Sequence, residues 1–180
     1  MCSSDLLQLD DVSSAEASVN EARRIVDAAR GLPPWWRPRI LALVGEVEAC
    51  KGRSQEAERA FVDSANARRA IFGSSWSAAE GFFDLGRFRS NDGRYGPALA
   101  AYRTAFGMID IDSTTRPEIR FQRLAPFMEA AIGFGEQNPA QRPALAREMF
   151  RVSQLAREGA ASQTIARASA RVAKIGRAHV

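Results

Sequence analysis

The chain has 180 residues, of which 46% are hydrophobic and 26% charged, a balance typical of a chain that buries a core. No apolar run approaches the roughly 20 residues that cross a bilayer, so no membrane partner is predicted. The formal net charge is +4, but the basic residues are nearly all arginines, without a long basic run or an aromatic–basic platform. Nucleic-acid binding is therefore not predicted either.

The two ends of the chain are related at the level of their codons. Codons for residues 175–179 can be chosen so that their reverse complement encodes residues 1–5 from a GTG start. Protein chemistry gives no reason for this relation, whereas a sequencing adapter read through at both ends of an insert does. We interpret residues 1–6 and 174–180 as adapter-derived. One helical-repeat domain, truncated at both ends, is predicted over residues 7–173, and its cellular location is left unknown.

Removing the two end segments leaves Cys50 as the single cysteine and leaves no histidine. The pairs that nucleophilic catalysis and zinc binding usually need are then missing. A disulfide within residues 7–173 is also excluded. Cys50 is expected to be a small packing residue, and a reactive thiol is the alternative. The sequence thus predicts that this chain is not an enzyme and holds no metal or cofactor.

In chain order, the first helix is predicted over about 14–30, where apolar residues recur every three or four positions. Gly31 and the prolines that follow it end this helix. Pro38 suits the first turn of a second helix that extends to Lys51. Between the two helices, Trp35 and Trp36 are a candidate platform for a peptide. The alternative is that one of them covers the first hairpin while the other is half exposed.

Three further helices are predicted at residues 54–72, 76–91 and 95–108. Ser54 is the predicted N-cap of the first of them, and an Asn-Asp-Gly turn at 91–93 joins the other two. A polar loop follows over 110–116. Its two aspartates, Asp110 and Asp112, lack the other spaced oxygen ligands of a cation site, so no metal is predicted there.

A third, less regular hairpin is predicted after this loop. Its first helix should run over 117–134 and be closed by Gly135. On its second helix, Ala146 and Phe150 are expected to repeat an alanine–aromatic pair present in the earlier hairpins. A last helix should begin near Ser162.

One spacing occurs twice, 41 residues apart, and consists of a glycine, a second glycine, an alanine and an aromatic residue. The two sets are Gly45, Gly52, Ala57, Phe61 and Gly86, Gly93, Ala98, Tyr102. A small residue on one helix, a turn glycine, and an alanine and aromatic one turn apart on the next helix are what close antiparallel packing requires. The spacing therefore predicts two copies of one helical hairpin.

These positions resemble the small and large positions of tetratricopeptide repeats over roughly residues 40–155. Glu48 and Arg89 depart from the family, which often has tyrosine there, and the step of 41 residues is longer than the family's. The resemblance implies an all-α fold of antiparallel hairpins stacked as a TPR-like α-solenoid. It also implies a groove lined by the first helix of each hairpin, whose outward residues contact a ligand: Arg39, Glu46, Glu80, Phe83, Arg87, Asn91 and Glu129.

A second resemblance concerns residues 154–157 and 162–171. They are similar to the segment that joins such repeats to a caspase-like CHAT domain in bacterial proteins. This implies a parent protein whose protease residues lie beyond Ala173, with none of that chemistry in this chain.

Three functions follow as expectations. The first is a protein-interaction scaffold that binds a peptide or protein partner, because mixed charge with one aromatic residue suits a peptide. The second is a substrate-recognition or regulatory arm of a CHAT-type cysteine protease whose catalytic domain is missing from this fragment. The third is a structural or self-assembling solenoid. For each candidate groove residue, the alternative is an ordinary solvated helix face.

Overall fold

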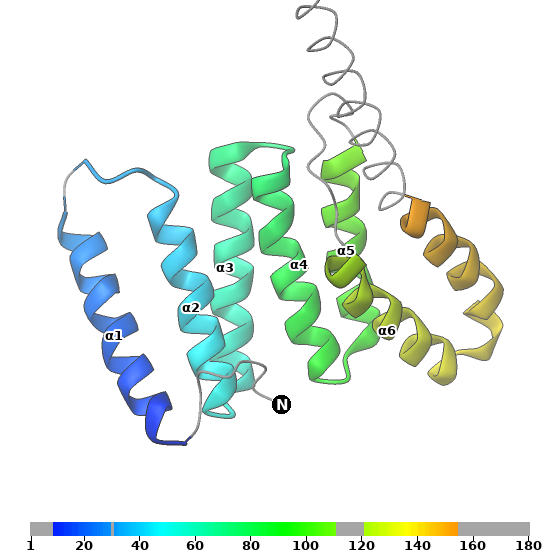
Figure 1. Ribbon diagram of the computed structural model, residues 1–180, viewed down its shortest axis with the longest axis horizontal. Helices are drawn as coiled ribbons and strands as arrows, with labels where there is room; N and C mark the ends of the chain where they lie inside the picture. The colour runs from blue at the N-terminus through cyan, green and yellow to red at the C-terminus, as the bar shows by residue number, and fades with distance from the viewer. Residues whose placement is uncertain (1–8, 30, 111–120, 155–180) are drawn as a thin grey trace, which may run out of the picture. The chain divides into compact units, whose positions relative to one another are not determined.

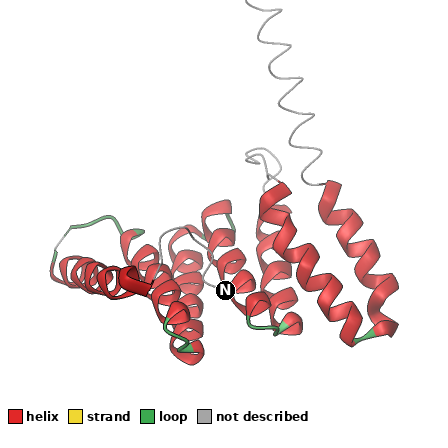
Figure 2. Cartoon of the chain, turned by 60° about the horizontal axis from the view of Figure 1, so that its bottom comes forward, coloured by secondary structure: helices red, strands yellow, loops and turns green. Residues whose placement is uncertain are grey.

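The computed structural model describes residues 9–29, 31–110 and 121–154 (Figure 1). These residues are helical with short turns and contain no strand, which confirms the all-α class (Figure 2). The elements are α1 (Leu9–Ala28), α2 (Trp36–Cys50), α3 (Ser54–Phe72), α4 (Trp76–Asn91), α5 (Tyr95–Asp110), α6 (Phe121–Gln137), a 3₁₀ turn η1 (Pro139–Gln141) and a helix over 142–154. The proposed adapter segments, most of the polar loop and the helix expected near Ser162 lie outside the described residues.

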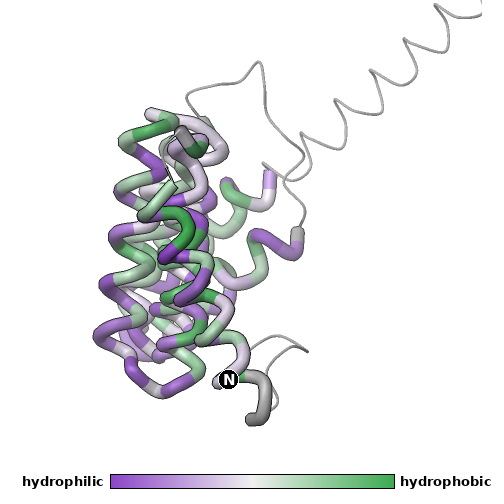
Figure 3. The backbone as a smooth tube through the Cα atoms, turned by 90° about the vertical axis from the view of Figure 1, so that its left-hand side faces the viewer, coloured by the Kyte–Doolittle hydropathy of each residue, from purple (hydrophilic) through white to green (hydrophobic). Residues whose placement is uncertain are grey.

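The chain divides into two compact units, Met1–Ser113 and Thr114–Val180. In the first unit each helix packs against the next in sequence, from α1 to α5, as neighbouring antiparallel helices (Figure 1). Hydrophobic and hydrophilic residues alternate along these helices, so that each has an apolar side for its neighbours (Figure 3). The second unit contains α6, η1 and the helix over 142–154.

The repeated spacing builds the same contact in both hairpins of the first unit. A Cβ atom added at Gly45 would lie 3.0 Å from the ring of Phe61, and one added at Gly86 would lie 2.7 Å from the ring of Tyr102. Both aromatic side chains are buried. Because only a glycine lets the ring approach so closely, it fixes how near the two helices of each hairpin come.

The two hairpin turns are equivalent bond for bond. Gly52 has φ 74° and Gly93 has φ 71°, the left-handed conformation that favours glycine. The N–H of Arg53 donates to the carbonyl of Glu48, and that of Arg94 donates to the carbonyl of Arg89, both at 2.9 Å. The turn glycines also donate back to the carbonyl three residues earlier. Each first helix therefore ends in a Schellman motif.

Two predicted helix starts are wrong. The first helix begins at Leu9, before the predicted residue 14. Ser54 is the first residue of α3 and not its N-cap, which is Arg53 and has no side-chain capping bond. The Ser54 hydroxyl instead lies 3.4 Å from a carboxylate oxygen of Asp92, in the turn of the next hairpin. The bounds predicted for α3 and α4 are confirmed.

The predicted details of the third hairpin are also wrong. Gly135 does not close α6, which continues to Gln137. The turn is made by Asn138, whose amide Nδ2 donates to the carbonyl of Phe134 at 3.1 Å, and by η1. Phe150 is 69% exposed. The buried residues of the last described helix are Leu145 and Val152, because the 3₁₀ turn sets a different rotation of that helix from the one the alanine–aromatic spacing implies.

The glycine–aromatic contact predicts a sign difference between two substitutions on neighbouring helices. Gly86→Ala should lower the free energy of unfolding by about 1–3 kcal/mol, because its methyl group meets the ring of Tyr102. Gly107→Ala is the matched control, since nothing lies within 4 Å of its added Cβ. Removing that helical glycine should raise the free energy of unfolding by about 0.5–1 kcal/mol. Urea unfolding of the full chain measures both, and a Gly86 variant as stable as the parent would contradict the packing argument.

Candidate functional site

Four of the predicted groove residues lie on the outward sides of α2 and α4. Arg39 and Glu46 are exposed on α2, Asn91 is exposed at the end of α4, and Arg87 is partly exposed one turn before it. Glu46 and Arg87 occupy the same position in successive hairpins, 41 residues apart, and their side chains pair at 3.3 Å. This ion pair joins the outward side of α2 to that of α4. It leaves Arg39 and Asn91 with no hydrogen bond or ion pair in the described part of the chain.

Phe83 does not belong to this surface, and its predicted outward position is wrong. The side chain is 4% exposed. Its ring centroid lies 5.9 Å from that of Trp76, 6.3 Å from that of Tyr102 and 5.3 Å from that of Phe106. Because Phe83 lies one turn before Gly86, it is on the part of α4 that packs on α5. It is therefore a core residue of the second hairpin.

The other two predicted residues lie apart from the pair of Glu46 and Arg87. Glu80 is partly buried and its carboxylate binds the guanidinium of Arg68 at 3.1 Å, so it ties α4 to α3. Arg68 also donates to the carbonyl of Ser77 at 3.2 Å. Glu129 lies exposed on α6, in the second unit.

A charged cluster that sequence reasoning missed joins the two hairpins of the first unit. Glu58 on α3 binds Arg89 of α4 at 2.8 Å and also binds Arg94 in the following turn. Arg94 in turn binds Asp92 at 2.8 Å, and Arg89 donates to the carbonyl of Pro97 at 3.2 Å. The available signal was a change of charge between equivalent positions. Glu48 pairs with Arg53 within its own turn, whereas Arg89 stands at the position of Glu48 and needs a carboxylate from another helix.

The environment of Glu58 holds it in the charged form. Burial acts most strongly and raises the pKa of the Glu58 carboxyl, but hydrogen bonds from Arg94 and Arg89, helped by their charges, outweigh it. The net pKa of Glu58 is therefore below its ordinary value. Arg94 shows the reciprocal effect, since burial lowers its pKa while Glu58 and Asp92 raise it above the ordinary value.

A second cluster ties α1 to the first hairpin. Lys51 pairs with Glu16 of α1 and lies 3.7 Å from a carboxylate oxygen of Glu48. The hydrogen bond from Lys51 is the main reason that the pKa of the Glu16 carboxyl is below its ordinary value. Both clusters lie near the turn ends of the hairpins and hold helices together.

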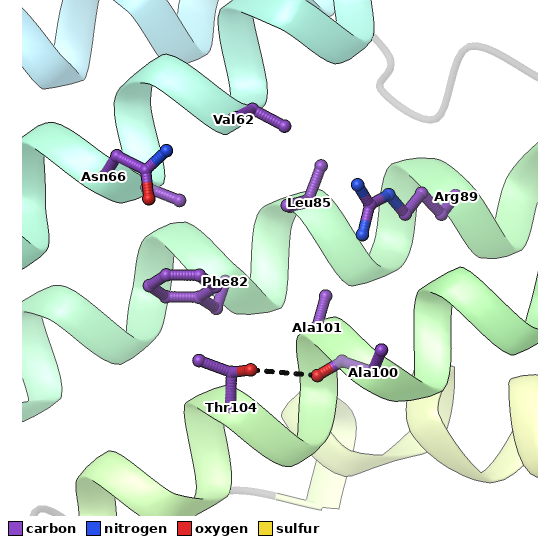
Figure 4. A pocket seen from close by; sticks show the side chains of 9 residues that line it. Val62, Asn66, Phe82, Leu85, Arg89, Ala100, Ala101 and Thr104 are labelled. Carbon is purple, nitrogen blue, oxygen red and sulfur yellow. Dashed lines mark hydrogen bonds between the residues drawn. The ribbon is translucent and has the colours of Figure 1, made fainter.

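A cavity of about 230 Å³ opens on the side of α4 opposite to Arg87 (Figure 4). Its lining comes from α3, α4 and α5, and consists of Val62, Ala65, Asn66, Phe82, Leu85, Arg89, Ala100, Ala101 and Thr104. The Thr104 hydroxyl donates to the carbonyl of Ala100 at 3.0 Å, and the Arg89 guanidinium is held by Glu58. These local partners leave the cavity mainly apolar. Its lining of small and apolar residues from three helices shows no motif in the sequence.

Cys50 is not the free packing residue that the sequence suggested. It is disulfide-bonded, and its bonding partner lies outside the described residues. Among residues 9–29, 31–110 and 121–154, no three His, Cys, Asp or Glu side chains gather as metal ligands. Within the same ranges, no helix has the length and apolar character needed to cross a membrane.

Comparison with known proteins adds no assignment. No family model matches this chain, and no match was found among the curated proteins or the solved structures. The resemblances to tetratricopeptide repeats and to CHAT-linked segments therefore remain predictions.

The Glu58 cluster predicts a specific acid sensitivity. Because the pKa of Glu58 is lowered in the folded protein, its stabilising effect is complete above the unfolded-state pKa of about 4.3 and is lost as the pH falls through the folded value. Glu58→Gln should lower the free energy of unfolding by about 1–2 kcal/mol near neutral pH and flatten its fall on acidification.

Glu56→Gln is the matched control, because Glu56 is exposed on the same helix and has no ion pair within the described residues. Urea unfolding between about pH 6 and pH 3 makes the comparison. Equal acid dependence in the Glu58 variant and the parent would show that the cluster does not contribute.

Proposed function

We propose that this chain is a protein-interaction scaffold that binds a peptide or protein segment along the outward sides of α2 and α4. The observation that carries the proposal is the equivalence of the two hairpins, in their turns and in their glycine–aromatic contacts. A repeated hairpin presents equivalent helix faces side by side, which is how helical repeats form extended binding surfaces. Stacking as a TPR-like α-solenoid is part of the same proposal.

The chemistry of the α2 and α4 surface suits a peptide ligand. Glu46 and Arg87 present opposite charges, and Asn91 presents both a hydrogen-bond donor and an acceptor. Exposed Leu43 adds an apolar contact on α2. None of these side chains fills the hairpin cores, so substituting them should alter recognition without unfolding the protein. A nucleic acid would instead favour a surface of one charge sign.

Peptides selected from a random display library against the full chain provide the test. Arg87→Ala combined with Asn91→Ala should weaken binding of the selected peptides by about tenfold. The matched control is Arg59→Ala combined with Asn66→Ala, which removes the same two residue types from exposed positions of α3. Circular dichroism verifies that both variants are folded. Unchanged affinity in the first variant, or equal losses in both, would contradict the proposed surface.

A second candidate is the recognition or regulatory arm of a CHAT-type cysteine protease, favoured by the resemblance of residues 154–157 and 162–171. Here the same surface would present a substrate or respond to an activating partner. Amplifying and sequencing the gene from its source DNA past Ala173 tests this. We expect a downstream domain with a His and Cys pair, and a stop codon soon after Ala173 would instead leave a free-standing adaptor.

A further inference from the structure

Large apolar side chains gather at one end of the first unit. Its exposed large hydrophobic residues are Ile25, Leu32, Trp35, Trp36, Leu43, Ile71 and Phe72. All but Leu43 lie where α1 ends, α2 begins and α3 ends, at the upper edge of these helices in Figure 1. We call these six residues the tryptophan end. An exposed apolar cluster of this kind is typical of an interaction site.

Specific contacts hold the three helices together at this end. The Ser64 hydroxyl donates to the carbonyl of Pro38 at 2.7 Å, which sets the last turns of α3 beside the start of α2. Arg37 pairs with Asp27 at 3.2 Å and so connects the first turn of α2 to the last turn of α1. The apolar side chains are thus presented together by packed helices.

The two tryptophans form a paired aromatic surface. Their ring centroids are 4.6 Å apart and their planes differ by 22°, which is a stacked arrangement. Trp35 is 39% exposed and Trp36 is 36% exposed. Stacked indoles present a broad, rigid apolar area at little cost in side-chain entropy, a property that makes tryptophan common at binding hot spots.

Comparison with the second hairpin explains why this end is open. Trp35 is equivalent to Trp76, 41 residues later. Trp76 packs against Phe83, whereas the position equivalent to Phe83 is Ala42, which offers no ring. Trp35 therefore stacks on Trp36 at the surface. The first hairpin lacks the residue that buries the equivalent tryptophan in the second.

The charged residues differ in the same way. Glu80 binds Arg68 in the second hairpin, and the equivalent positions in the first are Arg39 and Asp27. Asp27 is occupied by Arg37 at 3.2 Å and by Arg23 at 3.8 Å. Arg39 thus has no ion pair in the part of the chain that the structure describes. It lies one helical turn from both tryptophans, close enough to pair with a ligand that contacts them.

The start of α2 adds to the positive character of this end. Its first turn contains no acidic residue, and no side chain caps its N–H groups. The positive end of the helix dipole is therefore not compensated by the protein. Together with Arg39, it surrounds the indoles with a field that attracts carboxylates.

We propose that the tryptophan end is the docking site for an acidic segment of a partner protein that carries one large apolar side chain. The apolar side chain packs on the stacked indoles, and flanking carboxylates pair with Arg39 and the first turn of α2. The inference rests on the proposed function, since Arg39 continues the α2 surface. An anionic membrane fits less well, because Asp27 and Glu21 lie on the last two turns of α1. A second copy fits less well because two such ends would repel.

A short fluorescein-labelled peptide, with aspartates and glutamates flanking one phenylalanine, is the probe. Fluorescence anisotropy with the full chain should show binding that weakens with added salt. Trp36→Ala and Arg39→Glu should each weaken binding about tenfold. Arg59→Glu is the control for charge, because Arg59 is exposed on α3, has no ion pair within the described residues and differs in net charge from the parent by the same amount. Replacing the phenylalanine of the probe by alanine should also weaken binding.

The outcomes separate this inference from the proposed function. Arg39→Glu leaves the hairpin cores untouched, so it remains informative if Trp36→Ala does not fold. Equal affinity of the Arg39 and Arg59 variants, or no binding of the probe, would overturn the inference. If library-selected peptides still depended on Arg87 and Asn91, the proposed function would stand without it. Tryptophan-dependent binding to anionic lipid vesicles, or tryptophan-dependent dimerisation in light scattering, without binding of the probe, would also overturn it.

Discussion

The contact between a helical glycine and an aromatic ring sets the geometry of both hairpins in the first unit. Phe61 lies against Gly45, and Tyr102 lies against Gly86, so closely that a methyl group does not fit. This approach brings the buried Ala57 and Ala98 into the same interfaces. With helix separation and rotation fixed in this way, the side chains left outside each hairpin are those that face neighbouring helices or solvent. The candidate surfaces are consequences of this packing.

Charge then distinguishes two hairpins that share one backbone design. In the first, Glu48 and Arg53 pair within a single turn, whereas in the second Arg89 and Arg94 require Glu58 from the preceding hairpin. The change from glutamate to arginine at one repeat position thus turns a local pair into a link between hairpins. Partly buried clusters of this kind depend on complete pairing, because an unpaired member would retain its desolvation cost.

The sequence predicts what depends on local spacing and fails where a neighbouring element decides. The bounds of α3 and α4 follow from turn glycines and a repeated pattern, and the structure has them as predicted. Phe83 was assigned to the surface because helical spacing does not reveal that Trp76 and Phe106 meet it. Phe150 was assigned to a core by analogy, but the 3₁₀ turn before its helix changes which residues face inward. The candidate site was predicted only in part for the same reason.

Repeated architectures make unsatisfied groups easier to interpret, because each position has an internal reference. Trp76 and Glu80 have partners in the second hairpin, so the same backbone position is able to bury an indole and to pair a charge. Trp35 and Arg39 occupy those positions without such partners. Both departures fall at the same end of the same helix, next to an uncapped first turn. Exposed indoles carry a cost in water that a bound apolar side chain would remove, and an unpaired arginine gives such a ligand its charge preference.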